Sequence, residues 1–133
     1  GGGPEPEVLD IEAADFMEYK DLRESIFKRE GGRCFYCRRQ LRNRTRVLDH
    51  VVPKARRGRN SYRNLVSCCV ECNAAKGENP AGDLLRKLFR QGLLNAREMQ
   101  ERRTALESLR KGMRKPVFEV VADNNKLVED KSE

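Results

Sequence analysis

The sequence contains no tryptophan, few aromatic residues and little apolar material. Of its 133 residues, 38% are hydrophobic, 6% are aromatic and 37% are charged. A chain of this length fits one domain of ordinary size with tails. Because so short and polar a chain buries only a small hydrophobic core, we expect an additional link, such as a bound metal, to hold the fold together.

The sequence also lacks the segments that direct a protein to a membrane or out of the cell. No apolar run approaches the length of a membrane span, and the start does not form a signal peptide. We therefore expect no membrane partner. The three glycines at residues 1–3 are not preceded by an initiator methionine, and we interpret them as a cloning remnant.

Acidic residues are scarce in the middle of the chain. Residues 33–63 contain eleven lysines and arginines, and Asp49 is the only acid among them. Residues 1–20 and 117–133 carry net charges of −5 and −3, whereas the whole chain carries +7. This pattern is typical of binding to a polyanion through the middle of the chain, although its sign alone does not separate DNA, RNA and anionic membrane.

Apolar residues at helical spacing predict three longer helices, over residues 14–30, 83–90 and 95–111. Paired glycines at residues 31–32 would end the first of them. At the start of the last one, Asn95 and Glu98 have the spacing of a capping box, in which each side chain bonds the other residue's backbone N–H.

The segment between these helices predicts extended structure followed by a short helix. Residues 45–52 are rich in valine and leucine and predict a strand, which Pro53 would end. A short helix is expected over residues 70–76, closed by Gly77. The expected organisation is a flexible tail over 1–13, a domain over 14–116 with a motif core at 32–77 and flanking helices at 14–30 and 83–111, and an edge strand with an acidic flexible tail in 117–133.

Four of the five cysteines form two C-x-x-C pairs, Cys34 with Cys37 and Cys69 with Cys72, separated by 31 residues. A two-residue gap lets one tight turn present two thiolates to the same ion, and Zn²⁺ prefers four such ligands in a tetrahedron. The pairs therefore predict a structural zinc site without an open position. Cys68 is expected to be a buried neighbour of this site.

Other interpretations of the cysteines have less support. A pair of redox dithiols is one, but a single C-x-x-C would be sufficient for that chemistry. An iron–sulfur cluster is another, but no further cysteine group with typical spacing is present. An odd number of clustered cysteines also argues against a secreted disulfide framework, and so predicts a cytoplasmic, intracellular protein.

The only histidine, His50, lies between the two cysteine pairs in the sequence Asp49-His50-Val-Val-Pro. Asn64 follows it, and Asn73 comes directly after Cys72. Each of these residues has an ordinary structural explanation when taken alone, such as a turn or an exposed carboxylate. Their joint occurrence inside the cysteine frame favours a functional site.

The order of these motifs over residues 32–77 resembles the HNH, or ββα-metal, endonuclease family. The resemblance implies an α+β fold with a small zinc-stapled ββα-metal core, to which this chain adds flanking helices. It implies that Asp49 and Asn73 hold Mg²⁺ or Mn²⁺, that His50 activates water, and that Asn64 braces the loop that orients His50. The three letters of the family name fall on His50, Asn64 and Asn73, with asparagine in place of the last histidine.

The chemistry of these residue types agrees with such roles. Hydrolysis of a phosphodiester needs a nucleophilic water and relief of charge on the phosphate. A neutral imidazole, with an ordinary pKa of about 6.5, can accept the proton of that water. Carboxylate and amide oxygens are the hard ligands that Mg²⁺ and Mn²⁺ prefer. Because adjacent strand residues point to opposite faces, Asp49 and His50 should be separated, His50 towards the water and Asp49 towards the metal.

Basic residues around the motif are candidates for contacts with a nucleic-acid backbone, and no pattern indicates base recognition. These candidates are Arg38, Arg39, Arg42, Arg44, Arg56, Arg57, Arg59 and Lys76. We therefore predict a metal-dependent HNH endonuclease that nicks DNA with low sequence specificity. RNA or a branched nucleic acid would suit the same charges, and the sequence does not fix an oligomeric state. The alternatives are a non-catalytic zinc-dependent nucleic-acid-binding module and a zinc scaffold for protein assembly.

Overall fold

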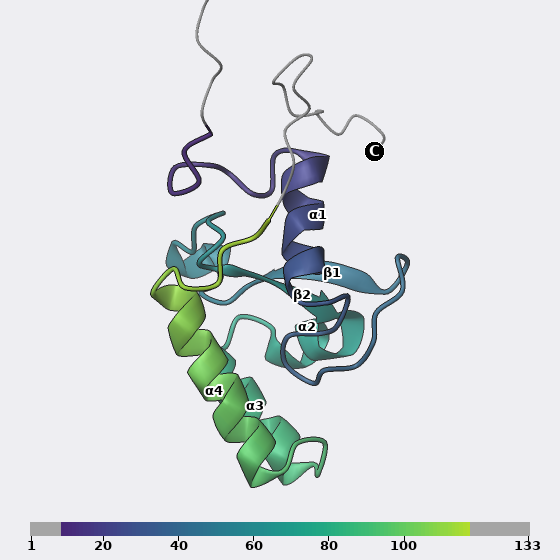
Figure 1. The fold of residues 1–133 in the computed structure, drawn as a ribbon. Coiled ribbons are helices and arrows are strands. Elements are labelled where there is room, and N and C mark those ends of the chain that lie inside the picture. Colours follow the sequence, from purple (N-terminus) through teal and green to yellow (C-terminus); the bar gives the residue numbers. More distant parts are fainter. Residues whose placement is uncertain (1–8, 118–133) are drawn as a thin grey trace, which may run out of the picture.

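The structure is a computed structural model, and it describes residues 9–117 (Figure 1). Their helices and two-stranded sheet confirm the predicted α+β class. In chain order the elements are α1 (Lys20–Arg29), β1 (Arg46–His50), the short 3₁₀ helix η1 (Lys54–Arg56), β2 (Leu65–Cys69), α2 (Val70–Lys76), α3 (Ala81–Arg90) and α4 (Ala96–Arg110). The predicted edge strand and acidic tail fall almost wholly on residues 118–133, outside the described residues.

β1 and β2 form an antiparallel pair in which Asp49 lies opposite Val66 and His50 lies opposite Leu65. The strand predicted over residues 45–52 is thus shorter than expected at both ends. Its pairing stops at His50 because the side chain of Asn64 takes over both backbone groups of Val52, accepting from its N–H at 2.8 Å and donating to its carbonyl at 3.1 Å.

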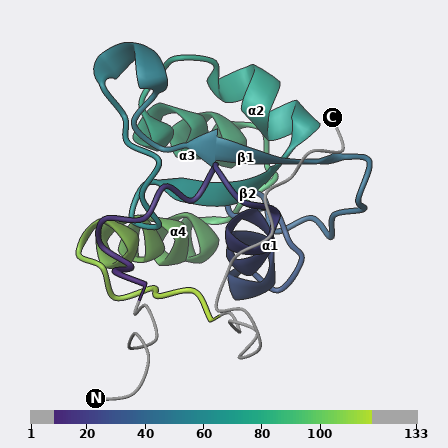
Figure 2. The ribbon, with the colours of Figure 1, turned by 90° about the horizontal axis from the view of Figure 1, so that it is seen from above.

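The sheet lies between helices on its two faces. Figure 2 shows α1 on one side of the strands and α2 on the other, and both helices contact both strands. Helices α3 and α4 pack on each other, and Figure 1 shows them as a hairpin that extends away from the sheet. Because α3 also contacts α2, the hairpin packs against the helix that covers this face of the sheet.

Two buried clusters occupy the two faces of the sheet. The cysteine-side cluster contains the cysteines, Phe35, Tyr36 and residues of α3 and α4, and Val47 and Val66 face it. The N-terminal cluster contains Phe16, Leu22, Ile26, Tyr62 and Leu65, and Leu48 packs against it. Since β1 alternates, Asp49 points to the cysteine-side cluster and His50 points to the face of the N-terminal cluster.

The N-terminal helix is shorter than its periodicity predicts: α1 begins at Lys20, and residues 11–13 and 16–18 form turns. The backbone N–H of Phe16 donates to the carbonyl of Asn60 at 2.7 Å, so at this residue the chain is bonded to a distant loop and does not continue a helix. The predicted capping box of α4 is confirmed, with both reciprocal bonds between Asn95 and Glu98 present.

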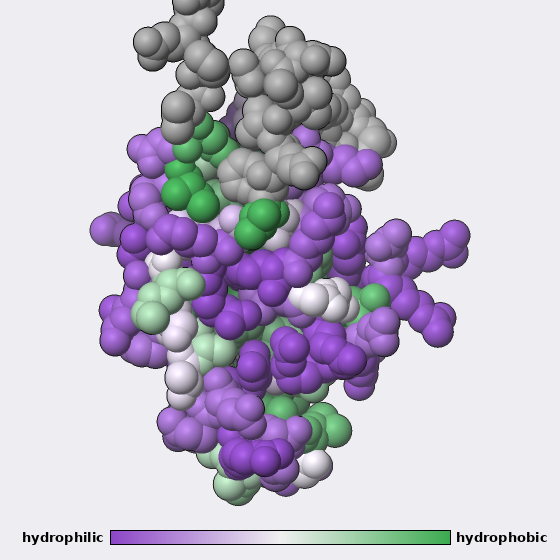
Figure 3. Space-filling view, viewed as in Figure 1, coloured by the Kyte–Doolittle hydropathy of each residue, from purple (hydrophilic) through white to green (hydrophobic). Residues whose placement is uncertain are grey.

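Hydrophilic residues cover most of the molecular face in Figure 3. Large apolar side chains that remain exposed, Val52, Val70, Phe89, Leu93, Met113 and Val117 among them, come from separate parts of the chain. In the part of the chain that the structure describes, no helix is both long enough and apolar enough to cross a bilayer.

Candidate metal centre and active site

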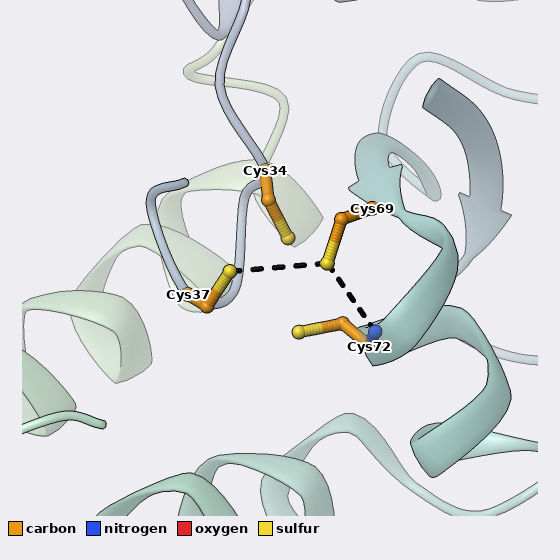
Figure 4. Close-up of side chains that lie close together, drawn as sticks. All are labelled: Cys34, Cys37, Cys69 and Cys72. Atoms are coloured by element: carbon orange, nitrogen blue, oxygen red, sulfur yellow. Dashed lines mark hydrogen bonds between the residues drawn. The ribbon is translucent and has the colours of Figure 1, made fainter. Parts of the chain in front are cut away.

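The two C-x-x-C pairs come together at one place, as Figure 4 shows. The sulfur atoms of Cys34, Cys37, Cys69 and Cys72 all lie within 4.8 Å of one another. Four ligands about 2.3 Å from a tetrahedral Zn²⁺ would have their sulfurs about 3.8 Å apart, and the Sγ atoms of Cys37 and Cys69 are 3.9 Å apart. The group could therefore hold a metal such as zinc.

Local backbone geometry presents these thiols in pairs. The turn at Cys34 is closed by hydrogen bonds from Arg38 N–H to the Cys34 carbonyl, 3.0 Å, and from Cys34 N–H to the Arg39 carbonyl, 2.8 Å. Cys69 is both the last residue of β2 and the N-cap of α2, and its Sγ accepts from the N–H of Cys72 at 3.3 Å. One cysteine pair thus follows α1, and the other joins β2 to α2.

The clustered thiols shift one another's pKa values in opposite directions. Hydrogen bonds from neighbouring thiols lower the pKa of Cys34, so it is the group's favoured thiolate. The pKa of Cys72 is raised, first because its thiol is bonded to Cys34. One negative sulfur thus suppresses ionisation of another, whereas a divalent cation would stabilise all four thiolates. Cys68 is fully buried, lies outside the four-sulfur group, and donates to the carbonyl of Cys69 at 3.3 Å.

Asp49 is buried on β1 with two protein partners. Its Oδ2 accepts a 2.7 Å hydrogen bond from the hydroxyl of Tyr36 and lies 3.5 Å from the ammonium of Lys76. Burial raises the pKa of the Asp49 carboxyl, while both partners act in the opposite direction. Sequence reasoning missed Tyr36. Its position inside the Cys34–Cys37 turn was an available signal, because that turn fixes where the tyrosine ring lies.

The location of Lys76 differs from the one predicted from the sequence. We expected it to contact a phosphate at the surface, but it is only 1% exposed, and its ammonium donates to the carbonyl oxygen of His50 at 3.0 Å. The physical reason is that the face of α2 that carries Lys76 packs on β1, where its long stem is buried and its charge meets Asp49. Asn73, one turn earlier on α2, is exposed.

His50 is half-buried at the end of β1. Its Nε2 lies 2.7 Å from the side-chain oxygen of Asn60. No motif in the sequence singled out Asn60, which lies in a polar loop ten residues later. The side chain of Asn64 is buried and bonds Val52 and the carbonyl of Arg59, at 3.0 Å, so it holds both ends of the loop that follows His50.

That loop is tightly closed. A side chain at Gly58 would place its Cβ 1.6 Å from the carbonyl oxygen of Val52, so only glycine fits. Next to it, Arg57 adopts a left-handed backbone with φ 68°. The backbone of this loop therefore has one compact conformation, and its basic side chains are exposed.

Most of the predicted backbone-contact residues are exposed, namely Arg39, Arg42, Arg44, Arg56, Arg57 and Arg59, whereas Arg38 is half-buried. Arg39 pairs with Glu71 at 2.9 Å. A cavity of about 480 Å³ beside Asn64 is lined in part by Arg57, Arg59, Arg63 and Arg110. Of these, Arg63 pairs with Glu12 and Arg110 pairs with Glu107.

Residues 34–89 match the sequence model of the HNH endonuclease family. This segment belongs to that family. The match includes all four clustered cysteines, His50 and helices α2 and α3 up to Phe89. It does not include α1, the turns before it or α4, so these parts flank the HNH domain.

Known proteins that are similar to the chain include two Cas9 enzymes. The CRISPR-associated endonuclease Cas9 of Corynebacterium diphtheriae is 34% identical over 68 residues, which are 50% of this chain and 6% of that protein. The crystal structure of the Type II-C Cas9 enzyme from Actinomyces naeslundii gives a TM-score of 0.46 at 22% identity, over 74% of this chain and 12% of that one. The chain thus spans a small fraction of the length of each.

Proposed function

We propose that the chain hydrolyses phosphodiester bonds in DNA, with His50 as the general base and a divalent metal held by Asp49 and Asn73. The observation that carries this proposal is the end of β1, where an HNH domain presents its only histidine next to a buried carboxylate, Asp49. Helix α2 lies over the same strand end through Lys76, and Asn73 is one turn earlier on that helix.

The donor set suits a hard cation. Asp49 uses Oδ2 for Tyr36 and Lys76, and among the described residues no hydrogen bond occupies its Oδ1. Asn73 is exposed and offers an amide oxygen. These two residues would hold Mg²⁺ or Mn²⁺, which when bound would neutralise charge on a phosphate. The four cysteines would hold Zn²⁺ as a structural ion.

The protein residues have separate tasks in this mechanism. His50 accepts the proton of the attacking water through an unprotonated ring nitrogen. Asn64 keeps the loop after His50 in place through its bonds to Val52 and Arg59. Lys76 balances the charge of Asp49 and fixes the carbonyl of His50, which limits movement of the strand end.

The DNA backbone would lie along the exposed arginines of the loop after His50, Arg56, Arg57 and Arg59, and of the segment with Arg42 and Arg44. Phosphate contacts of this kind position a duplex without reading its bases. We therefore propose nicking with low sequence specificity. Arg38 and Arg39 lie nearer the cysteines and would contact the backbone only at the edge of this surface.

The test is relaxation of supercoiled plasmid by the purified, zinc-loaded chain with Mg²⁺ or Mn²⁺. We expect wild-type protein to nick the plasmid and His50→Ala to lose at least about 100-fold of that rate. Arg97→Ala, an exposed change on α4, is the matched control and should keep full activity. Equal nicking by wild type and His50→Ala would contradict the mechanism.

A second candidate is a zinc-dependent nucleic-acid-binding module without catalysis, which the exposed arginines would also support. It predicts salt-dependent DNA binding by the wild-type chain, with no metal-dependent cleavage of linear, nicked, branched or RNA substrates. The same substrates, with binding measured in parallel, separate the two candidates.

A further inference from the structure

His50 is the first member of a chain of three side chains. Its Nε2 lies 2.7 Å from Oδ1 of Asn60, and Nδ2 of Asn60 lies 3.1 Å from Oδ2 of Asp15. The other oxygen of Asp15 accepts from the backbone N–H of Met17 at 2.8 Å. Asp15 precedes α1 and lies outside residues 34–89, which match the family.

The carboxylate of Asp15 fixes the direction of every hydrogen bond in this chain. An ionised carboxylate only accepts, so the group of Asn60 that faces it must be the NH₂. The amide oxygen of Asn60 therefore faces His50, and an oxygen that only accepts requires an N–H on Nε2. A neutral imidazole with its proton on Nε2 has an unprotonated Nδ1.

The backbone makes the same connection rigid. Phe16 N–H donates to the carbonyl of Asn60 at 2.7 Å, so adjacent residues of the N-terminal segment hold both the side chain and the main chain of Asn60. Phe16 is fully buried, and its ring packs edge-on against Tyr62 with centroids 6.0 Å apart. The segment before α1 is thus anchored by an aromatic residue next to the polar contact.

We propose that Asp15 and Asn60 are positioning residues that hold His50 as the Nε2–H tautomer and leave Nδ1 as the nitrogen that accepts the proton of water. This inference rests on the proposed role of His50 as a base. It adds that the segment before α1, outside the matched HNH region, completes the active site. Without that segment the imidazole would be free to exchange tautomers and to turn.

The direct test is the tautomer of His50 by ¹⁵N–¹³C correlation NMR, which needs no activity. Because the chain has a single histidine, its ring signals are unambiguous. At about pH 8.5, where an ordinary imidazole is neutral, we expect the Nε2–H form in wild-type protein. A predominant Nδ1–H form, or an even mixture, would overturn the inference whatever the activity of the chain.

Variants then test each link. Asp15→Asn replaces a group that only accepts by an amide that can also donate, so Asn60 is free to flip and we expect a clear rise in the Nδ1–H form. The exchange of the two residues, Asp15→Asn with Asn60→Asp, restores the direction of the bonds and should restore the Nε2–H form. Asp10→Asn is the control, because Asp10 also accepts from the backbone two residues on, Glu12 N–H at 3.0 Å, but is not part of the chain to His50.

Plasmid nicking provides the functional readout. We expect Asp15→Asn to lower the rate at least about tenfold, the double exchange to recover most of it, and Asp10→Asn to leave it unchanged. An unchanged tautomer in Asp15→Asn would contradict this inference but leave the proposed function intact. Failure of wild-type protein to nick, with the Nε2–H form present, would contradict the proposed function instead.

Discussion

The ammonium of Lys76 donates to the carbonyl oxygen of His50 across 3.0 Å, which ties the end of α2 to the end of β1. The same helix has Cys69 as its N-cap and Cys72 in its first turn, and both belong to the four-sulfur group. One short helix therefore has the four-sulfur group at its first turn and the strand that carries His50 at its last. A substitution at either end of α2 should therefore also affect the structure at its other end.

Replacement of Lys76 by methionine should be strongly destabilising, although methionine fills a similar volume. The substitution leaves the buried carboxylate of Asp49 with Tyr36 as its remaining partner, and loss of one member of a buried ion pair costs about 3–5 kcal/mol. The measurement is the free energy of unfolding by urea with zinc bound. Lys87→Met, at an exposed lysine of α3, is the control and should change stability by less than about 0.5 kcal/mol. Similar losses for the two variants would show that the pair with Asp49 is unimportant.

Removal of the metal should unfold the region around the sulfur group. We expect about one zinc per chain, and loss of the ordered amide spectrum after treatment with a chelator. Cys69→Ala should fail to retain zinc. Cys68→Ala, its immediate neighbour outside the four-sulfur group, should retain it, although a small cavity would lower its stability. Equal zinc content in the two variants would mean that the ligands are assigned wrongly.

Substitution of Gly58 by alanine should disrupt the loop that follows His50. The new Cβ would lie 1.6 Å from the Val52 carbonyl oxygen, so the backbone must move, at a cost of at least about 1–3 kcal/mol. Gly82→Ala is the matched control, because at this helical position the Cβ would have only an ordinary 3.7 Å contact with Arg86. It should stabilise the protein by about 0.5–1 kcal/mol. Thermal unfolding of both variants is the measurement, and equal shifts in Tm would contradict the close approach at Gly58.

Features set by spacing along the chain could be predicted from the sequence. A two-residue gap lets one tight turn present both of its cysteines on the same side, and the Asn95 capping box depends only on residues of its own helix turn. The alternation of side chains along a strand likewise predicted that Asp49 and His50 point to opposite faces, without knowledge of their partners. These predictions needed no knowledge of which elements pack together.

Features set by tertiary packing could not be predicted in this way. Asp15 and Asn60 are 45 residues apart, and their contact depends on how the turns before α1 lie on the loop before β2. The spacing of Asn73 and Lys76 correctly placed them on neighbouring positions of one helix. It could not say which of the two would be buried, because a lysine stem is apolar enough to pack and its ammonium polar enough to be exposed.

Tyr36 gives the fold a dependence on alkaline pH. Burial, and then the charge of Asp49, raise its pKa well above the ordinary value of 10. The folded protein therefore keeps the phenol protonated at a pH where the unfolded chain ionises it. Since the unfolded state then binds fewer protons, the stability from this group is complete below about pH 10 and is lost as the pH rises towards the folded-state pKa.

Tyr36→Phe removes both the hydrogen bond to Asp49 and this source of pH dependence. Near pH 8 the variant should be less stable than wild type by about 1–3 kcal/mol, because a buried carboxylate loses a donor. Between about pH 10 and 11 wild type should lose about 1.4 kcal/mol per pH unit from this group, whereas the variant loses none from this position. The two unfolding free energies, measured on zinc-loaded protein, should therefore converge at high pH. A constant difference across that range would mean that Tyr36 ionises as readily in the folded state as in the unfolded chain, and that its contact with Asp49 is weaker than its 2.7 Å length implies.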